Sequence, residues 1–298
     1  MKDFKLVTAK TVDEAVEALA KYGDKCKLIA GGTDAMLMIR DGKWNNLTLI
    51  NIRDIEELRG IKLEGDTVTI GALTRLSDIE HSDVLKEHAP CLWGAAQLFA
   101  DPTNRHSATI GGNVGRCNTV GDTLPSLLCL DAVVTIVSKE GEREVPMSEM
   151  LLGPGKTACE PNEMIAKFTF KSQPNSAYMK FGRRKSMALS MAGSAVSIKV
   201  DDKGIVEDIR IAAGNAGPKA VRCYNAEKAM IGVDLKSDKA IEEPLYKVIQ
   251  DDIAPRKKPR LGNWISGEYR RELISVLTKR AARKAAFGEC MLCKQEEA

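Results

Sequence analysis

The chain has 298 residues, of which 44% are hydrophobic and 29% are charged, with 44 Lys and Arg against 41 Asp and Glu. This length and apolar content allow two or three domains with proper cores and exclude an intrinsically disordered chain. The net charge of +3 is too small and too dispersed for a nucleic-acid-binding surface. No apolar run approaches the roughly 18 residues of a membrane span, and the first residues do not resemble a secretory signal. We therefore expect a cytoplasmic protein with no membrane span and no nucleic-acid partner.

The first 55 residues predict a small α/β unit. A strand over residues 4–7 is followed by Thr11-Val12-Asp13-Glu14, which has the form of a capping box, and apolar residues then recur at helical spacing until Gly23. Two further strands are predicted over residues 27–30 and 47–50.

The segment that follows predicts a second unit, richer in strands. Residues 67–70, 133–137 and 165–170 have strand patterns, Thr74 is a candidate cap for a short helix through Ile79, and residues 91–99 suggest a buried helix. Asp122 and Pro125 suit the start of a helix through Leu130. The polar, proline-containing stretch at 171–177 is the best candidate for a domain boundary.

Beyond that boundary the sequence predicts a strand pair and then mainly helices. Residues 192–200 and 205–213 alternate as strands joined by the turn at 201–204. The last helix is predicted over 268–287, with Ser266 as its cap and Gly288 as its end.

Two glycine pairs interrupt apolar segments, in AGGTD at residues 30–34 and in TIGGN at residues 109–113. A Gly-Gly pair lets the backbone turn tightly and brings its N–H groups close to a pyrophosphate. Thr33 and Asp34 add a hydroxyl donor and an acceptor for phosphate or sugar. Alone, such a pair is more often only a turn, and the chain has neither a Walker A loop nor a GxGxxG opening.

Four motifs in order, AGGTD, TIGGN, GDTLP at 121–125 and KFGRRK at 180–185, resemble the flavin-binding medium subunit of the molybdenum hydroxylases. The resemblance covers essentially the full chain and is greatest to the xanthine or nicotinate dehydrogenase type. It implies an α+β protein with a vanillyl-alcohol-oxidase-like (PCMH-type) FAD-binding domain at 1–172, made of α/β subdomains at about 1–57 and 58–172. A C-terminal α+β domain like that of the CO dehydrogenase flavoprotein, with an antiparallel sheet and helices, would occupy 178–298.

The resemblance also implies a set of cofactor-binding residues. The first glycine motif would wrap the pyrophosphate of FAD, the second would contact it and the flavin from the other side, and Lys180 would lie near the flavin ring and tune its potential. The implied residues are Leu28, Ile29, Ala30, Gly31, Gly32, Thr33, Asp34, Ala35, Ala100, Thr109, Ile110, Gly111, Gly112, Asn113, Asp122, Ile165 and Lys180. Three of these also have simpler interpretations: Asp122 as a helix cap, Ile165 as a core residue, and Lys180 as part of a solvated charge run.

The sequence departs from the family at residues 100–106, where ADPTNRH replaces a GSPQIRN-like run. This segment would abut the flavin, so Asp101, Asn104 and His106 leave the details of flavin access open. Covalent FAD attachment often uses a histidine near the first glycine motif; none is present there, so non-covalent FAD is expected.

The eight cysteines do not form the dense framework of a small secreted domain. One branch of the family, resembling 4-hydroxybenzoyl-CoA reductase, holds an extra iron–sulfur cluster in an insertion that this chain lacks, although Cys117, Cys129 and Cys159 lie in the same region. Cys290 and Cys293 have the CxxC spacing of a metal or redox pair, but a second pair is missing. Free thiols and no metal site are therefore expected, with a metal site shared with another subunit as the alternative.

The function implied is that of an electron-transfer flavoprotein subunit. A molybdopterin-binding large subunit would oxidise a purine or another N-heterocycle, and a small subunit with two [2Fe-2S] clusters would relay electrons to FAD in this chain, which would pass them to NAD⁺ as the acceptor. The alternatives are a self-contained flavin-dependent oxidoreductase of the same fold and a non-catalytic assembly protein. No nicotinamide fingerprint is visible, so ferredoxin or a quinone stays open as acceptor.

Overall fold

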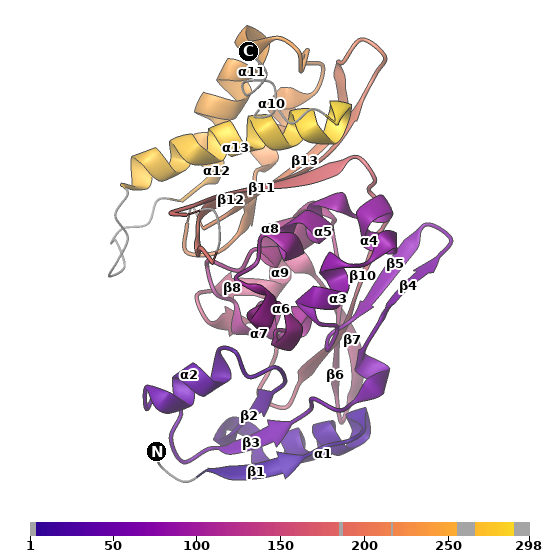
Figure 1. Ribbon diagram of the computed structural model, residues 1–298, viewed down its shortest axis with the longest axis vertical. Coiled ribbons are helices and arrows are strands. Elements are labelled where there is room, and N and C mark those ends of the chain that lie inside the picture. The colour runs from indigo at the N-terminus through magenta and orange to yellow at the C-terminus, as the bar shows by residue number, and fades with distance from the viewer. Residues whose placement is uncertain (1–3, 185–186, 216, 255–265, 289–298) are drawn as a thin grey trace.

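The computed structural model describes residues 4–184, 187–215, 217–254 and 266–288. Its three main sheets follow one another along the long axis of the molecule in chain order (Figure 1). Each has its own cluster of buried apolar side chains. Helices and antiparallel sheets are thus combined in an α+β protein, as predicted. The division into domains at residues 172 and 178 stays a prediction.

The first unit is a parallel sheet of order β1-β3-β2. Thr11 caps its first helix by accepting from the Glu14 amide, and the apolar face of that helix packs on the sheet. The elements are β1 (Lys5–Thr8), α1 (Val12–Tyr22), the 3₁₀ turn Gly23–Lys25, β2 (Cys26–Ile29), α2 (Ala35–Arg40), β3 (Thr48–Asn51) and the 3₁₀ turn Glu56–Leu58.

The second unit is an antiparallel sheet of order β4-β5-β10-β6-β7, covered by short helices (Figure 1). Its strands and the hairpin β8–β9 are β4 (Ile61–Glu64), β5 (Thr67–Gly71), β6 (Val133–Ser138), β7 (Gly141–Pro146), β8 (Leu151–Gly153), β9 (Lys156–Thr157) and β10 (Met164–Lys171). Its helices are α3 (Leu76–Glu80), α4 (Asp83–His88), α5 (Pro90–Gln97), α6 (Pro102–Ser107), α7 (Ile110–Arg116), α8 (Thr123–Cys129) and α9 (Met147–Met150).

Two helix starts in this unit differ from the predicted ones. Thr74 does not cap α3, whose N-cap is Arg75; the Thr74 hydroxyl instead donates to the Gly60 carbonyl and accepts from its amide. Asp122 stands at the N-cap position of α8, but its side chain makes no capping hydrogen bond. In both cases a tertiary partner replaces the local one.

The third unit is an antiparallel sheet of order β11-β12-β13-β14, with the predicted pairing of β12 and β13. The last helix, α13, begins after its Ser266 cap, ends at Gly288 and packs on β11 and β12. The elements are β11 (Ser176–Gly182), β12 (Ser190–Val200), β13 (Val206–Gly214), β14 (Val221–Arg222), α10 (Tyr224–Met230), α11 (Asp238–Glu242), the π-helix Glu243–Val248, α12 (Ile249–Asp252) and α13 (Gly267–Phe287).

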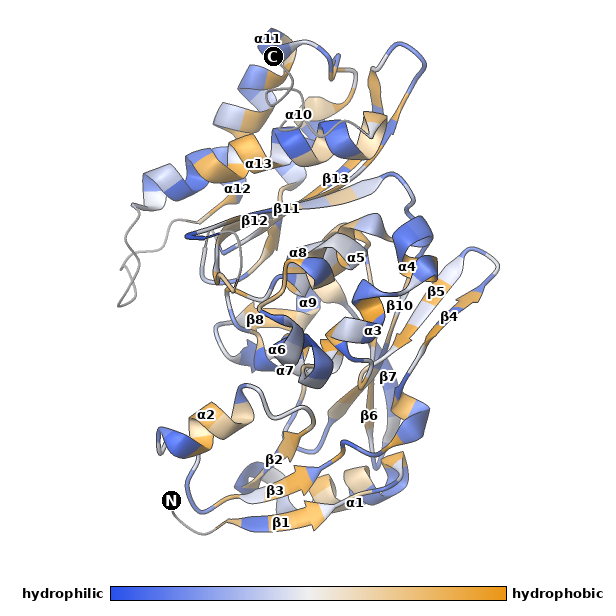
Figure 2. Cartoon of the chain, in the orientation of Figure 1, coloured by the Kyte–Doolittle hydropathy of each residue, from blue (hydrophilic) through white to orange (hydrophobic). Residues whose placement is uncertain are grey.

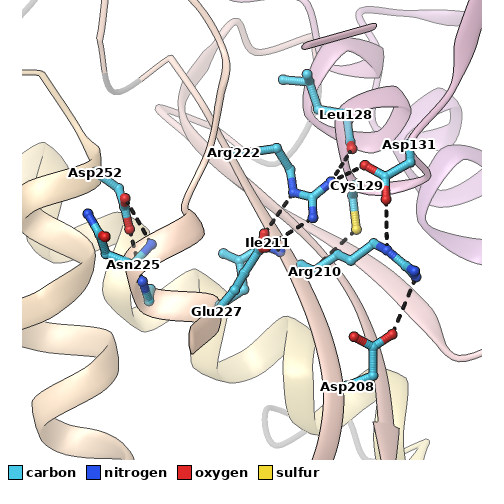
Figure 3. Close-up of polar contacts among 11 residues, drawn as sticks. Leu128, Cys129, Asp131, Asp208, Arg210, Ile211, Arg222, Asn225, Glu227 and Asp252 are labelled. Carbon is cyan, nitrogen blue, oxygen red and sulfur yellow. Dashed lines mark hydrogen bonds and ion pairs between the residues drawn. The ribbon is translucent and has the colours of Figure 1, made fainter. Parts of the chain in front are cut away.

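A charged network joins the second and third units at the C-terminal end of α8 (Figure 3). Arg222 donates to the Leu128 carbonyl at 3.1 Å and pairs with Asp131 just beyond the helix, and Asp131 also pairs with Arg210 at 2.8 Å. Glu227 accepts from Arg222 at 2.7 and 3.0 Å. Cations at the last carbonyls of a helix are favourable, so the network holds α8 in place.

Candidate functional site

A cleft of about 1030 Å³ lies where the first unit meets α6, α7 and the hairpin β8–β9. Its volume is at the upper end of the roughly 300–1,000 Å³ range of small-molecule sites. Every predicted cofactor-binding residue except Ile110 and Lys180 lines it. Motifs that are 80 residues apart in the sequence therefore face one space.

The first glycine pair is required for close packing within the chain and also lines the cleft. A Cβ on Gly31 would lie 1.7 Å from the Ser107 carbonyl oxygen, so only glycine lets this loop meet the segment that leads into TIGGN. Gly32 has a φ of +73°, a left-handed conformation that other residues adopt at a cost. Both glycines line the cleft.

The second glycine pair is helical rather than a loop, because TIGGN forms the start of α7. Thr109 caps the helix by accepting from the Gly112 amide at 3.1 Å, and Ile110 is fully buried in the core. A Cβ on Gly111 would lie 2.7 Å from Ala72, whereas Gly112 is exposed to the cleft. The first glycine of each pair is thus needed for close contact within the chain.

The side chain of Asn113 is held in one orientation at the cleft. Its Oδ1 accepts from the buried Thr123 hydroxyl at 2.7 Å. Its Nδ2 makes no hydrogen bond with any described residue, so this amide can donate into the cleft.

Asp122 and Lys180 form a buried ion pair at 2.7 Å, with side chains only 4% and 6% exposed. Tyr178 donates to the other carboxylate oxygen at 2.8 Å, and Lys180 also donates to the Leu98 carbonyl at 2.8 Å. Burial raises the pKa of the Asp122 carboxyl, and Lys180 opposes that rise. Asp122 lines the cleft and Lys180 does not, so the ion pair is what links Lys180 to the cleft wall. The tuning of the flavin by Lys180 stays a prediction.

The ADPTNRH segment forms the capped helix α6. Asp101 accepts from the Asn104 amide at 3.0 Å, and Arg105 pairs with Glu80 at 2.7 Å. Asp101 and Asn104 line the cleft, while His106 is exposed outside it and bonds the Pro102 carbonyl. Within the departure from the family pattern, Ala100, Asp101 and Asn104 therefore face the site, and His106 does not.

The structure also brings residues to the cleft that the sequence did not indicate. Trp44 and Phe99 add aromatic walls, and Arg116 pairs with Asp34 across the space. Helix α2, whose residues are mostly hydrophobic (Figure 2), adds Met38, while its exposed Met36 and Leu37 do not line the cleft. No local pattern marks Trp44, Phe99 or Arg116 as a site residue, because each comes from a different segment.

Six free cysteines lie in the described ranges, and five of them are buried. No group of three or more His, Cys, Asp or Glu that could hold a metal occurs in those ranges. Cys290 and Cys293 fall outside the described residues.

Cys159 lines the cleft and provides a probe of its occupancy. Burial raises its pKa to about 11, so alkylation by iodoacetamide is expected to be slow at pH 8 and to accelerate toward pH 11. Added FAD should slow it further. Peptide mapping by mass spectrometry resolves this thiol from the others, and an alkylation rate that FAD leaves unchanged would contradict occupancy of the cleft.

The donors and shape of the cleft fit a dinucleotide cofactor. Thr33, Thr109 and Asn113 offer hydroxyl and amide donors at its wall, and apolar side chains such as Ile29 and Ile165 line it as well. Gly112 and Gly115 line the cleft without side chains, so the backbone of α7 is accessible there. The fold and the cleft thus define the class of protein as one that binds a dinucleotide-sized cofactor between two units.

Comparisons with known proteins place the chain in one family. Residues 2–170 match the model of the FAD binding domain in molybdopterin dehydrogenase, and residues 176–285 match the CO dehydrogenase flavoprotein C-terminal domain. The chain belongs to this family and is an FAD-binding oxidoreductase subunit of the molybdenum hydroxylases.

Individual relatives match over 79% or more of the chain. The xanthine dehydrogenase FAD-binding subunit of Escherichia coli O157:H7 is 34% identical, over 93% of this chain and 94% of that protein. The nicotinate dehydrogenase FAD-subunit of Eubacterium barkeri is 32% identical over 79% and 82%. A carbon monoxide dehydrogenase structure from Hydrogenophaga pseudoflava superposes with a TM-score of 0.87 at 31% identity, covering 96% of this chain and 98% of that one. The predicted family and fold are confirmed.

None of the helices in the described ranges combines the length and the hydropathy needed to span a bilayer.

Proposed function

We propose that this chain is the flavin subunit of a three-part molybdenum hydroxylase, which takes electrons from [2Fe-2S] clusters of a small partner and delivers them to NAD⁺. Substrate oxidation belongs to a molybdopterin-binding partner, and the substrate is a purine or another N-heterocycle. The relatives named xanthine and nicotinate dehydrogenase subunits support this substrate class. We also propose a cytoplasmic location.

The observation that carries the proposal is the convergence of both glycine motifs on one cleft. FAD held there would supply the ability to accept electrons singly and release them as a pair. The loop at Gly32 and the N-terminal turn of α7 would hold the pyrophosphate, non-covalently. Asn113 would orient the ligand, and the Asp122–Lys180 pair would set the charge beside it.

A self-contained flavin oxidoreductase is the alternative, and co-purification distinguishes the two. A complex that contains molybdenum and iron and reduces NAD⁺ with an N-heterocycle as donor supports the proposal. A lone chain that turns over substrate supports the alternative. Reduction of ferredoxin or a quinone but not of NAD⁺ would change only the acceptor.

Cofactor content tests the proposal at the residue level. Gly32→Val forces a β-branched residue into a left-handed conformation in the loop and should lower the FAD content of the assembled complex. Two results together would contradict the proposed function. The wild-type complex would show no flavin absorbance, and the Gly32→Val variant would have the same cofactor content as the wild type.

A further inference from the structure

We propose that Arg116 is a phosphate-binding residue of the cleft, which ties its two walls together through Asp34 and offers its remaining donors to the pyrophosphate of the cofactor. This inference rests on the proposed function. It adds a side-chain cation to a site that the sequence predicted to hold phosphate mainly through glycine backbone.

Arg116 and Asp34 come from opposite sides of the cleft. Arg116 is the last residue of α7, and its Nε donates to Asp34 Oδ2, in a pair that spans 82 positions of sequence. Asp34 occupies the N-cap position of α2, but its side chain makes no capping bond there. Both residues line the cleft, with side chains 29% and 34% exposed, so the pair is accessible to a ligand.

Most of the Arg116 guanidinium is unused. A guanidinium has five N–H donors in a planar fork, and the Nη1 and Nη2 groups of Arg116 make no hydrogen bond with any part of the chain that the structure describes. Gly155, on the hairpin β8–β9, leaves space beside it, because a Cβ there would lie 3.2 Å from Arg116 Nη1. The fork matches the geometry of phosphate oxygens.

The charges around the cleft favour this assignment. Two of the other carboxylates that line the cleft are in ion pairs, Asp122 with Lys180 and Glu163 with Arg143. Asp101 accepts from the Asn104 amide, and the exposed Glu160 has no ion pair with any described residue. Asp34 lies two residues after Gly32 and, unpaired, would repel a pyrophosphate held by that loop. Arg116 therefore both neutralises Asp34 and leaves donors for the anion.

Affinity measurements on the full-length chain test the proposal. Flavin fluorescence titrations would compare FAD with riboflavin, which lacks phosphate, for the wild type, Arg116→Gln, Arg116→Lys and Asp34→Asn. Arg116→Gln should weaken FAD about 10- to 100-fold, the range for a hydrogen bond to a charged group, and leave riboflavin unchanged. Arg116→Lys should recover part of the loss, and Asp34→Asn, which keeps the Arg116 donors, should not show a selective loss of FAD over riboflavin.

The outcomes separate this inference from the proposed function. If the pair serves only to join the walls, Arg116→Gln and Asp34→Asn will weaken FAD and riboflavin alike, and the phosphate role is overturned. Unchanged FAD affinity in Arg116→Gln overturns it too. A wild-type chain that binds no FAD would instead contradict the proposed function.

Discussion

Replacing Lys180 with methionine is expected to lower the free energy of unfolding by about 3–5 kcal/mol at neutral pH, the usual cost of removing one partner from a buried ion pair. The Lys180 ammonium and the Asp122 carboxylate are both almost fully buried, and methionine keeps the length of the side chain without its charge. The carboxylate would then retain only neutral donors, Tyr178 among them. Chemical denaturation of the full-length chain measures the loss.

The loss should depend on pH. Burial already raises the pKa of Asp122, and without Lys180 that pKa rises further. The folded state then binds a proton more tightly than the unfolded state, so stability falls as pH rises from the ordinary carboxyl range through the raised pKa. Lys180→Met should therefore be closer to wild-type stability at pH 4 to 5, in about the range of ordinary carboxyl titration, than at pH 7.

Two controls make this prediction specific to the buried pair. Lys180→Met combined with Asp122→Asn should regain most of the lost stability, because no unpaired charge remains. Lys199→Met removes the lysine of an exposed pair with Glu207 at 2.7 Å and should change stability little. Equal losses of unfolding free energy in Lys180→Met and Lys199→Met would show that the buried pair contributes no more to stability than the exposed one.

Replacing Gly31 with alanine is the second change with a large expected effect. The added methyl would overlap the Ser107 carbonyl, so either the AGGTD loop or the segment before α7 must move. We expect a stability loss of about 3 kcal/mol, at the upper end of overpacking effects, and a large drop in FAD affinity because both walls of the cleft shift.

Gly32 and Gly115 provide matched controls for Gly31→Ala. Gly32→Ala meets no backbone but is strained at φ +73°, so it should cost about 1–3 kcal/mol. Gly115→Ala makes only an ordinary contact with Ile165 in helix α7 and should be neutral or slightly stabilising. A Gly31→Ala variant as stable as Gly115→Ala would contradict the contact between the two motifs.

Much of the fold could be predicted because local signals and tertiary packing agree. Thr11, Ser266 and Gly288 mark helix ends that the structure has, and the strand pair of β12 and β13 lies where alternation predicted it. The prediction that Thr74 caps α3 was wrong because a local cap and a tertiary partner compete for the same hydroxyl. In the structure that hydroxyl bonds Gly60. The helical start of α7 was missed because two adjacent glycines disfavour a helix locally.

The candidate site was predictable as a set of segments but not as a set of contacts. The glycine motifs identified the cleft, but nothing in the sequence joins Asp34 to Arg116 or Asp122 to Lys180. These pairs are 82 and 58 positions apart, and only the packed fold brings them together. The charge beside the predicted flavin is consequently that of an ion pair rather than of a free lysine.

The FAD content of a Gly115→Leu variant tests the central claim most directly. Gly115 lines the cleft on α7, where leucine favours the helix and its Cβ would meet only the Ile165 side chain, at 3.8 Å. The fold should therefore persist while the rest of the side chain fills the cleft. The wild-type chain, desalted after incubation with FAD, should retain stoichiometric flavin, and Gly115→Leu should retain almost none at an unchanged melting temperature. Full retention of FAD by Gly115→Leu would contradict the binding of the cofactor between the two glycine motifs.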